Sequence, residues 1–191
     1  MRNIQLILFS NLFIFISLFI INDFDIKLNN IRTQEAEKIL WASDKKLKWS
    51  DFEGAKKFSK LNSVAVTQCE IVILDIKVVN GLPLIKVANF FDKKESWTTT
   101  DEQWALDHEQ LHFDIYELFT RKIRKDFKRL NDLGVIDINE YQKAYDNFIE
   151  QAEKMNEKYD KEVYFNLEMQ NNWSKSIENE LIKLKEYELK E

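Results

Sequence analysis

Apolar side chains in the first half of the chain follow the pattern of strands. The segment SVAVTQCEIVILDIKVV (63–79) is rich in β-branched residues, and LIKVANFFDKKESW (84–97) has a similar character. The NGLP sequence between them (80–83) is a turn signal. We therefore expect a hairpin or meander, preceded by a short extended piece, LKWSDFEGA (47–55), that ends in a turn at Gly54.

Beyond residue 98 the apolar positions recur every three or four residues, which is the spacing of amphipathic helices. The segment TTTDEQ (98–103) contains two possible capping boxes for the first helix, which should end before Gly134. A second helix should begin near Asp137, and a third should follow residue 166. The predicted apolar faces are Leu111, Ile115, Leu118, Phe119, Ile123, Phe127 and Leu130, then Tyr141, Tyr145, Phe148, Ala152, Met155 and Tyr159, then Met169, Trp173, Ile177, Leu181 and Leu184.

Strands followed by helices indicate an α+β fold. We expect a small, mainly antiparallel sheet from about residue 47 to residue 97, packed beside three helices, with the first helix against the sheet. The chain has 191 residues, 45% of them hydrophobic, which is enough for one domain with a substantial core. Three glycines and one proline are few helix breakers for this length, so long helices are favoured.

The first residues are much more apolar than the rest. Arg2 is followed by a run from Ile4 to Ile21 that contains no charged residue. A basic start and an apolar run are typical of a secretory signal, and this run approaches the roughly 20 residues that span a bilayer. We therefore expect residues 1–24 to be a signal peptide or an N-terminal membrane anchor. Residues 25–191 should form a single extracytoplasmic domain, which is secreted, periplasmic or anchored to the outer face of the cytoplasmic membrane.

Charge and cysteine content narrow the function classes. The formal net charge is −5 and no basic block occurs, so a nucleic-acid partner is not indicated. Cys69 is the single cysteine, so no intramolecular disulfide can form. Packing, with or without a metal, must therefore hold the domain together.

Both histidines of the chain lie in the segment DHEQLHFDI (107–115), with Glu109 directly after His108 and His112 four residues after His108. On a helix, residues four apart lie roughly 40° apart around the axis, so both imidazoles can aim at one point. Neutral imidazole suits Zn²⁺, which lowers the pKa of a bound water to about 7. Glu109 can take the proton of that water as a general base, as in HExxH hydrolases.

These segments resemble a family of bacterial secreted proteins of uncharacterised function, described as predicted secreted zinc-dependent proteases. The resemblance runs from about Leu47 to the last helix. Its pieces are LKWSDFEG (47–54), SVAVT (63–67), SW (96–97), HEQLHFDIYEL (108–118), YDKEV (159–163), and Gln170 with Trp173. It implies that His108 and His112 bind the metal and that Glu109 is catalytic. By analogy it also implies a zincin-like arrangement around the helix that carries them.

One departure from this family concerns the third metal ligand. After the Tyr-Asp pair, relatives tend to have a threonine and then a histidine two places on, where this chain has Val163 and Phe165. A catalytic zinc site needs three protein ligands, so the third must be a carboxylate or a tyrosine. Asp160 is our first choice, because a second helix antiparallel to the first returns it towards residue 108. The other candidates are Glu162, Glu153 and Glu157, with Asp114 and Glu117 disfavoured because they are too close to His112 on the same helix.

Three functional hypotheses follow. The first is a zinc metallopeptidase acting on a peptide or protein substrate, with a possible membrane tether through the N-terminal segment. The second is a non-catalytic envelope binding or structural protein that has lost a metal ligand, in which Asp160 could instead orient a histidine. The third is an anchored helical protein with an accidental motif. Trp97, at the end of the last strand, marks a possible edge for pairing with an extended peptide.

Overall fold

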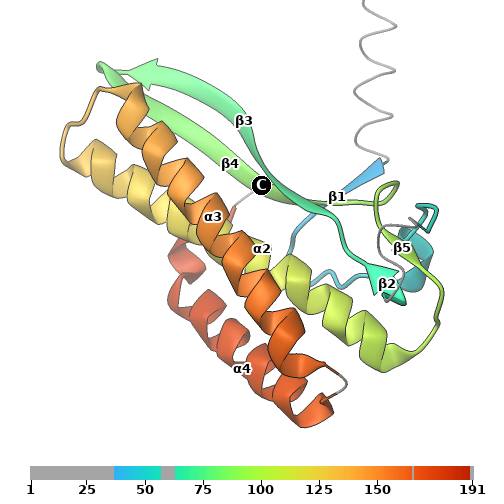
Figure 1. The fold of residues 1–191 in the computed structure, drawn as a ribbon. Helices are drawn as coiled ribbons and strands as arrows, with labels where there is room; N and C mark the ends of the chain where they lie inside the picture. The colour runs from blue at the N-terminus through green and yellow to red at the C-terminus, as the bar shows by residue number, and fades with distance from the viewer. Residues whose placement is uncertain (1–36, 57–62, 165, 190–191) are drawn as a thin grey trace, which may run out of the picture. The chain divides into compact units, whose positions relative to one another are not determined.

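The computed structural model describes residues 37–56, 63–164 and 166–189 (Figure 1). Its strands are β1 (Lys38–Leu40), β2 (Ala65–Val66), β3 (Cys69–Val79), β4 (Leu82–Asp92) and β5 (Trp97–Thr98). Its helices are α2 (Gln103–Asp132), α3 (Ile138–Val163) and α4 (Leu167–Lys183), with short 3-10 helices η1 (Trp49–Asp51) and η3 (Lys185–Tyr187). The fold is therefore α+β, with three helices packed against small antiparallel sheets.

The expected signal or anchor at residues 1–24 lies outside the described residues. Within the described part of the chain, no helix is long and apolar enough to cross a membrane.

The predicted hairpin is formed by β3 and β4, which pair antiparallel up to Val79 opposite Leu82. Asn80 and Gly81 make the turn with φ angles of 52° and 83°, the left-handed conformation that a two-residue hairpin loop requires. β1 pairs with β4 to complete a three-stranded sheet in the order β1-β4-β3, and β2 and β5 form a separate pair. The hairpin prediction is confirmed.

The predicted extent of the sheet is wrong at its beginning. β1 precedes residue 47, and the segment expected to be extended forms η1 instead. The carboxylate of Asp51 accepts a hydrogen bond from the backbone NH of Lys48 at 2.8 Å, and the Asp51 NH donates to the Lys48 carbonyl. This local hydrogen bonding favours a helical turn over an extended segment.

The observed limits of the helices agree with the predictions from the sequence, whereas the predicted capping boxes of the first helix do not form. α2 begins at Gln103, but neither predicted capping box forms, because Glu102 is the N-cap and makes no side-chain cap. The Thr98 hydroxyl instead donates to the Thr100 carbonyl at 2.7 Å. α3 begins at Ile138, directly after Asp137 as predicted, and the Asp137 carboxylate caps it by accepting a hydrogen bond from the Asn139 NH at 3.0 Å.

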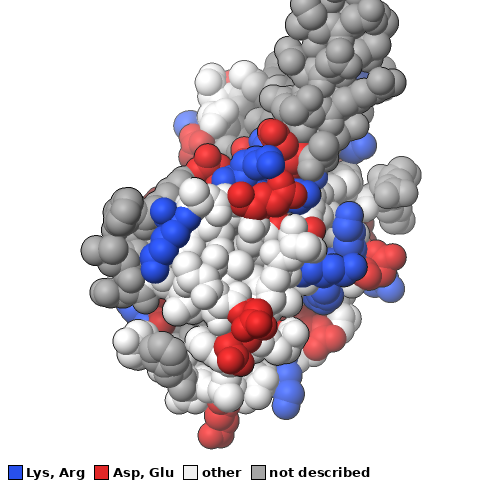
Figure 2. Space-filling model, turned by 90° about the vertical axis from the view of Figure 1, so that its right-hand side faces the viewer, with Lys and Arg blue, Asp and Glu red and all other residues white. Residues whose placement is uncertain are grey.

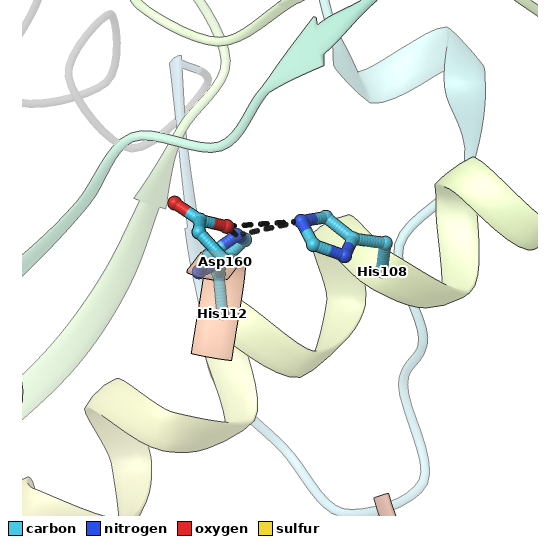
Figure 3. Close-up of side chains that lie close together, drawn as sticks. All are labelled: His108, His112 and Asp160. Atoms are coloured by element: carbon cyan, nitrogen blue, oxygen red, sulfur yellow. Dashed lines mark hydrogen bonds and ion pairs between the residues drawn. The ribbon is translucent and has the colours of Figure 1, made fainter. Parts of the chain in front are cut away.

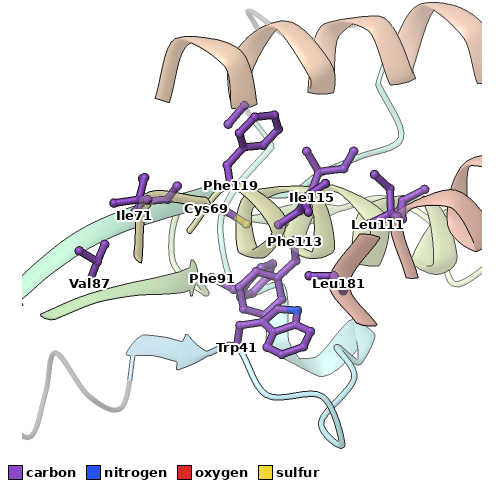
Figure 4. Close-up of a cluster of buried hydrophobic side chains, with 14 of the residues drawn as sticks. Trp41, Cys69, Ile71, Val87, Phe91, Leu111, Phe113, Ile115, Phe119 and Leu181 are labelled. Carbon is purple, nitrogen blue, oxygen red and sulfur yellow. The ribbon is translucent and has the colours of Figure 1, made fainter. Parts of the chain in front are cut away.

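The main core lies between the β3–β4 hairpin and α2 (Figure 4). The side chains of Val87, Phe91, Phe113 and Ile115 are at most 1% exposed. The predicted apolar face of α2 is buried along its whole length, which makes this helix the centre of the fold. On α4 the prediction is wrong for Met169, which is 37% exposed.

Gly54 is required by a close approach of two backbone segments. Its NH donates to the Ser96 carbonyl at 2.8 Å, and a Cβ at this position would lie 2.5 Å from the Lys94 oxygen. We expect Gly54→Ala to lower the free energy of unfolding by about 1–3 kcal/mol, because backbone atoms must move apart. Chemical denaturation measures this loss. The exposed Ser50→Ala on η1 is the control, and an equal effect of both variants would refute the packing argument.

Candidate metal centre

α2 and α3 together position the predicted ligands. His108 and His112 lie one turn apart on α2, and α3 returns antiparallel to it and places Asp160 beside both imidazoles (Figure 3). The Asp160 Oδ1 atom lies 3.2 Å from His108 Nε2 and 3.0 Å from His112 Nε2. The two Nε2 atoms are 3.1 Å apart. The ligand atoms therefore converge on one point from two helices.

This group of three side chains could hold a metal ion. Ligand atoms at about 2.0–2.1 Å around a tetrahedral zinc lie about 3.4 Å from one another. The separations of 3.0–3.2 Å between these atoms are close to that value, so small side-chain shifts would suffice to admit the ion. His108 and His112 are largely buried, whereas 58% of the Asp160 side chain is exposed.

Asn156 fixes the orientation of His112. Its Nδ2 donates to the Ala152 carbonyl at 2.9 Å, so its Oδ1 faces the imidazole, 2.7 Å from His112 Nδ1. The oxygen accepts a hydrogen bond, so Nδ1 carries a proton, and Nε2 is the nitrogen that is free to bind a metal when the imidazole is neutral. Sequence reasoning missed Asn156, although its spacing of four residues from Asp160 on α3 places both on one helix face.

Aromatic side chains hold the other imidazole. The ring of Tyr159 stacks on His108 with centroids 4.6 Å apart and an interplanar angle of 21°. Trp173 of α4 packs against Tyr159 in turn, at 5.5 Å. Tyr159 was predicted as a core residue, and it is fully buried, but it also limits the rotation of a candidate ligand.

Burial and charge interactions shift three pKa values at this site, those of His112, Asp160 and the neighbouring Tyr159. Burial lowers the pKa of His112, but the hydrogen bond to Asp160 and the negative charges of Glu109 and Asp160 outweigh it, so this pKa lies above its ordinary value. Burial raises the pKa of Asp160, but the hydrogen bonds and charges of both histidines lower it more. The pKa of this carboxyl therefore lies well below its usual range. Burial and the charges of Glu109 and Asp160 raise the pKa of Tyr159, which opposes a tyrosinate ligand.

Glu109 lies beside the ligands but not among them. Only 5% of the residue is exposed, and Oε2 is buried without a hydrogen-bond partner among the described residues. A buried carboxylate oxygen without a partner is costly unless it faces a proton donor such as water. Its position is fixed from behind, since the Thr67 hydroxyl donates to the Glu109 carbonyl at 3.2 Å.

The structure does not bring the alternative carboxylates to this point. Asp114 is tied to Trp41 and Lys46, and Glu117 is buried between Arg121 and Arg124. Three others of α3 are exposed, with Glu162 bonded to Trp173, Glu157 paired with Lys161, and Glu153 on the outer surface.

Polar contacts anchor the same turns of α2 from the side opposite the ligands. The Leu47 NH donates to Gln110 Oε1 at 2.8 Å, and the Trp41 indole NH donates to Asp114 at 2.8 Å. The buried Asn89 of β4 donates through Nδ2 to the Phe113 carbonyl at 3.0 Å. These bonds set the rotation of α2 about its axis, and with it the direction of both histidines.

A cleft of about 430 Å³ opens over the candidate ligands. β2 lies along one side of it, and the end of α3 and the start of α4 form the other. Trp97 is a packing residue, since it is 1% exposed, and the possible peptide-pairing edge at this residue is not found, because its strand β5 pairs with β2. The strand beside the cleft is β2.

Comparison of the chain with protein-family models, with curated proteins and with solved structures finds no significant match.

Proposed function

We propose that this protein is a zinc-dependent metallopeptidase. One observation carries the proposal: two histidines and an aspartate converge at the floor of a cleft, beside a buried glutamate whose Oε2 has no hydrogen-bond partner among the described residues. The resemblance of the HEQLHFDIYEL segment to predicted secreted zinc-dependent proteases supports it.

Zinc suits this donor set because it binds imidazole nitrogen and carboxylate oxygen, and a catalytic zinc has three protein ligands with one open position. When bound, the metal would supply a Lewis acid for the substrate carbonyl and lower the pKa of the attacking water. His108, His112 and Asp160 would hold it, and Asn156 would keep His112 in the tautomer that can bind.

Glu109 would then act on protons. Its carboxylate takes a proton from the water that attacks the peptide carbonyl carbon. After attack, the same group gives that proton to the leaving amine, so that the C–N bond breaks and the carboxylate is regenerated. Its burial keeps the carboxylate out of bulk solvent. The interaction of the carboxylate with a charged or polarised partner is stronger in this buried environment than in water.

A peptide substrate is favoured by the backbone of β2. The Val64 carbonyl, just before β2, accepts a hydrogen bond from the Thr99 NH, just after β5, at 2.7 Å. The next residue, Ala65 of β2, lies opposite Thr98 of β5. In an antiparallel pair, alternate residues direct their NH and C=O away from the partner strand. Ala65, which lines the cleft, therefore directs both groups away from β5, and we propose that an extended peptide pairs with them there.

A non-catalytic binding protein is the second candidate. Val163 stands where the family has a threonine, and it is 3% exposed and packs in the core. The side chain of the candidate third ligand, Asp160, is 58% exposed. Such a site would bind metal weakly. In either case we propose that residues 1–24 direct export or tether the domain to the outer face of the cytoplasmic membrane.

Metal content and peptide hydrolysis test the proposal together. The full-length protein, kept in mild detergent because of its apolar first segment, should contain close to one zinc per chain after loading and dialysis. Zinc-loaded protein should cleave an unstructured protein substrate, and removal of the metal by a chelator should abolish cleavage. Metal binding that survives the double substitution of His108 and His112 by alanine would place the metal elsewhere.

The zinc affinity should depend on pH in a defined direction. The raised pKa of His112 means that a proton competes with the metal at a higher pH than at an ordinary histidine, whose pKa is about 6.5. Zinc binding should therefore weaken as the pH falls and begin to do so above about pH 6.5, by about tenfold per pH unit for each proton displaced. Competition with a chromogenic chelator from pH 8 to pH 5 measures this. An affinity unchanged over that range, in protein that stays folded by circular dichroism, would argue against histidine ligation.

A further inference from the structure

One end of the cleft has a chemistry that metal binding does not use. Trp104 and Ala105 at the start of α2, Val163 at the end of α3 and Leu167 at the start of α4 line it. We refer to these four residues as the apolar end of the cleft. They come from three helices, so this surface depends on the way the helices pack and not on one amphipathic stripe.

The apolar end lies about one residue of an extended substrate away from the position of a scissile bond at the metal group. Trp104 precedes His108 by four residues, which is slightly more than one helical turn, or about 6 Å along α2. An extended peptide advances about 3.3 Å per residue, and its side chains reach a few ångströms further. A substrate whose scissile carbonyl lies over His108 therefore directs the side chain of an adjacent residue into the apolar end.

Charge is absent where that side chain would lie. Among the described residues lining the cleft, the acidic side chains are Glu109 and Asp160, both at the metal group, and no lysine or arginine is present. One polar side chain beside the apolar end is already engaged, because Gln170 Nε2 donates to the Trp104 carbonyl at 3.0 Å. A charged substrate side chain would lose its hydration there without gaining a partner.

Apolar surface is exposed on both rims of the cleft. Val64, beside β2, is 40% exposed, and Leu167, at the apolar end, is 56% exposed. Figure 2 shows the end of the molecule where β2, β5 and the beginning of α2 lie, and most side chains in the middle of this face are uncharged, with one small acidic group among them. Covering apolar surface of this kind favours binding, because the surface is removed from water.

We propose that the apolar end is a specificity subsite for an apolar side chain adjacent to the scissile peptide bond. The substrates are then extended peptide segments that carry a residue such as leucine, methionine or phenylalanine at that position. This inference rests on the proposed peptidase function, since it assigns the substrate class of the same cleft.

Cleavage-site profiling tests the subsite. Zinc-loaded full-length protein is incubated with a peptide library, and the residues on both sides of each cut are counted. One adjacent position should favour apolar over acidic residues by about tenfold or more, the range in which an apolar pocket discriminates. Efficient cleavage with no preference at either adjacent position would overturn the inference and leave the peptidase function standing.

A charge introduced at the rim should change the preference. Leu167→Glu should lower cleavage beside leucine and raise cleavage beside lysine or arginine at the same position by about tenfold, because the new carboxylate supplies the missing partner. Ile138→Glu is a matched control, since Ile138 is also the first residue of a helix and 46% exposed, but lies outside the cleft. The same shift in both variants would contradict the assignment.

A binding measurement decides the matter even if no cleavage occurs. Leucine hydroxamate and aspartate hydroxamate carry the same metal-binding group on different side chains. Calorimetry on the zinc-loaded protein should give an affinity at least about tenfold higher for the leucine compound. That result without cleavage would refute the peptidase function but keep the subsite, whereas equal affinities would overturn the subsite.

Discussion

Replacing Asp160 with alanine is expected to lower the zinc affinity by about a thousandfold. Four-ligand structural sites bind zinc with about 10–16 kcal/mol, so one ligand contributes about 2.5–4 kcal/mol, and the upper end of this range corresponds to about a thousandfold. Among the described residues, Asp160 is the one carboxylate that lies beside both imidazoles, with 3.2 and 3.0 Å between Oδ1 and the two Nε2 atoms. Chelator competition on the full-length protein measures the affinity. Asp160→Asn keeps the size of the side chain and should show most of the loss.

Glu162→Ala is the matched control for this experiment. Glu162 lies on the same helix, two residues further on, and bonds to Trp173 instead of facing the histidines. Its replacement should change the zinc affinity less than about threefold, within the range of an exposed polar contact. If Asp160→Ala stays within about tenfold of the wild type, Asp160 orients the histidines without binding the metal. A large loss in Glu162→Ala instead would move the third ligand to that residue.

The second large effect is expected for Glu109→Gln. A general base contributes about 10²–10⁴ in rate, so peptide hydrolysis should fall by about a thousandfold. The zinc affinity should change by only a few fold, because Glu109 is not among the three converging ligands. Fluorogenic peptide assays and metal content, measured on the same preparations, separate the two effects. The amide has nearly the same shape as the carboxylate, so the Glu109→Gln variant should have an intact fold by circular dichroism.

Asp107→Asn controls for the loss of one negative charge near the metal group. Asp107 directly precedes His108 but is exposed and accepts a hydrogen bond from Gln103. Its replacement should leave hydrolysis within about twofold, since exposed charges are screened. Wild-type hydrolysis equal to that of Glu109→Gln would refute the general-base role. If both then lack activity but retain zinc, the non-catalytic binding protein becomes the better description.

Local patterns in the sequence predicted much of this fold. The Asn-Gly turn and the flanking β-branched residues predicted the hairpin, because a two-residue loop and its strands are determined within about twenty residues. The limits of α2 and α3 followed from periodicity, Gly134 and the Asp137 cap. Asp160 could be selected because two helices joined by a short turn must run antiparallel, and the structure places it beside His108 and His112.

Features that depend on distant contacts were not predictable in the same way. β1 is too short to be recognised from its residues and exists through its pairing with β4. Asn156 is an ordinary polar helix residue until the packing of α3 on α2 brings it to His112. A peptide-pairing edge was considered at Trp97, because the sequence does not show that β5 pairs with β2 and that Trp97 is buried. Pairing of distant segments, and not local propensity, determines all three.

The polar anchors behind α2 have a consequence for dynamics. Asn89 and Trp41 bond to Phe113 and Asp114, so this part of the helix is fastened to the sheet side while its other face carries the histidines. Opening it requires breaking buried bonds and the main core together, so its backbone amides should exchange with deuterium among the slowest of the chain. The metal-binding groups are then held in place before the ion arrives. The rate of zinc binding should therefore change little when the folded state is stabilised. Small domains that fold only around their zinc differ, because their metal-binding groups are not in place before the ion binds.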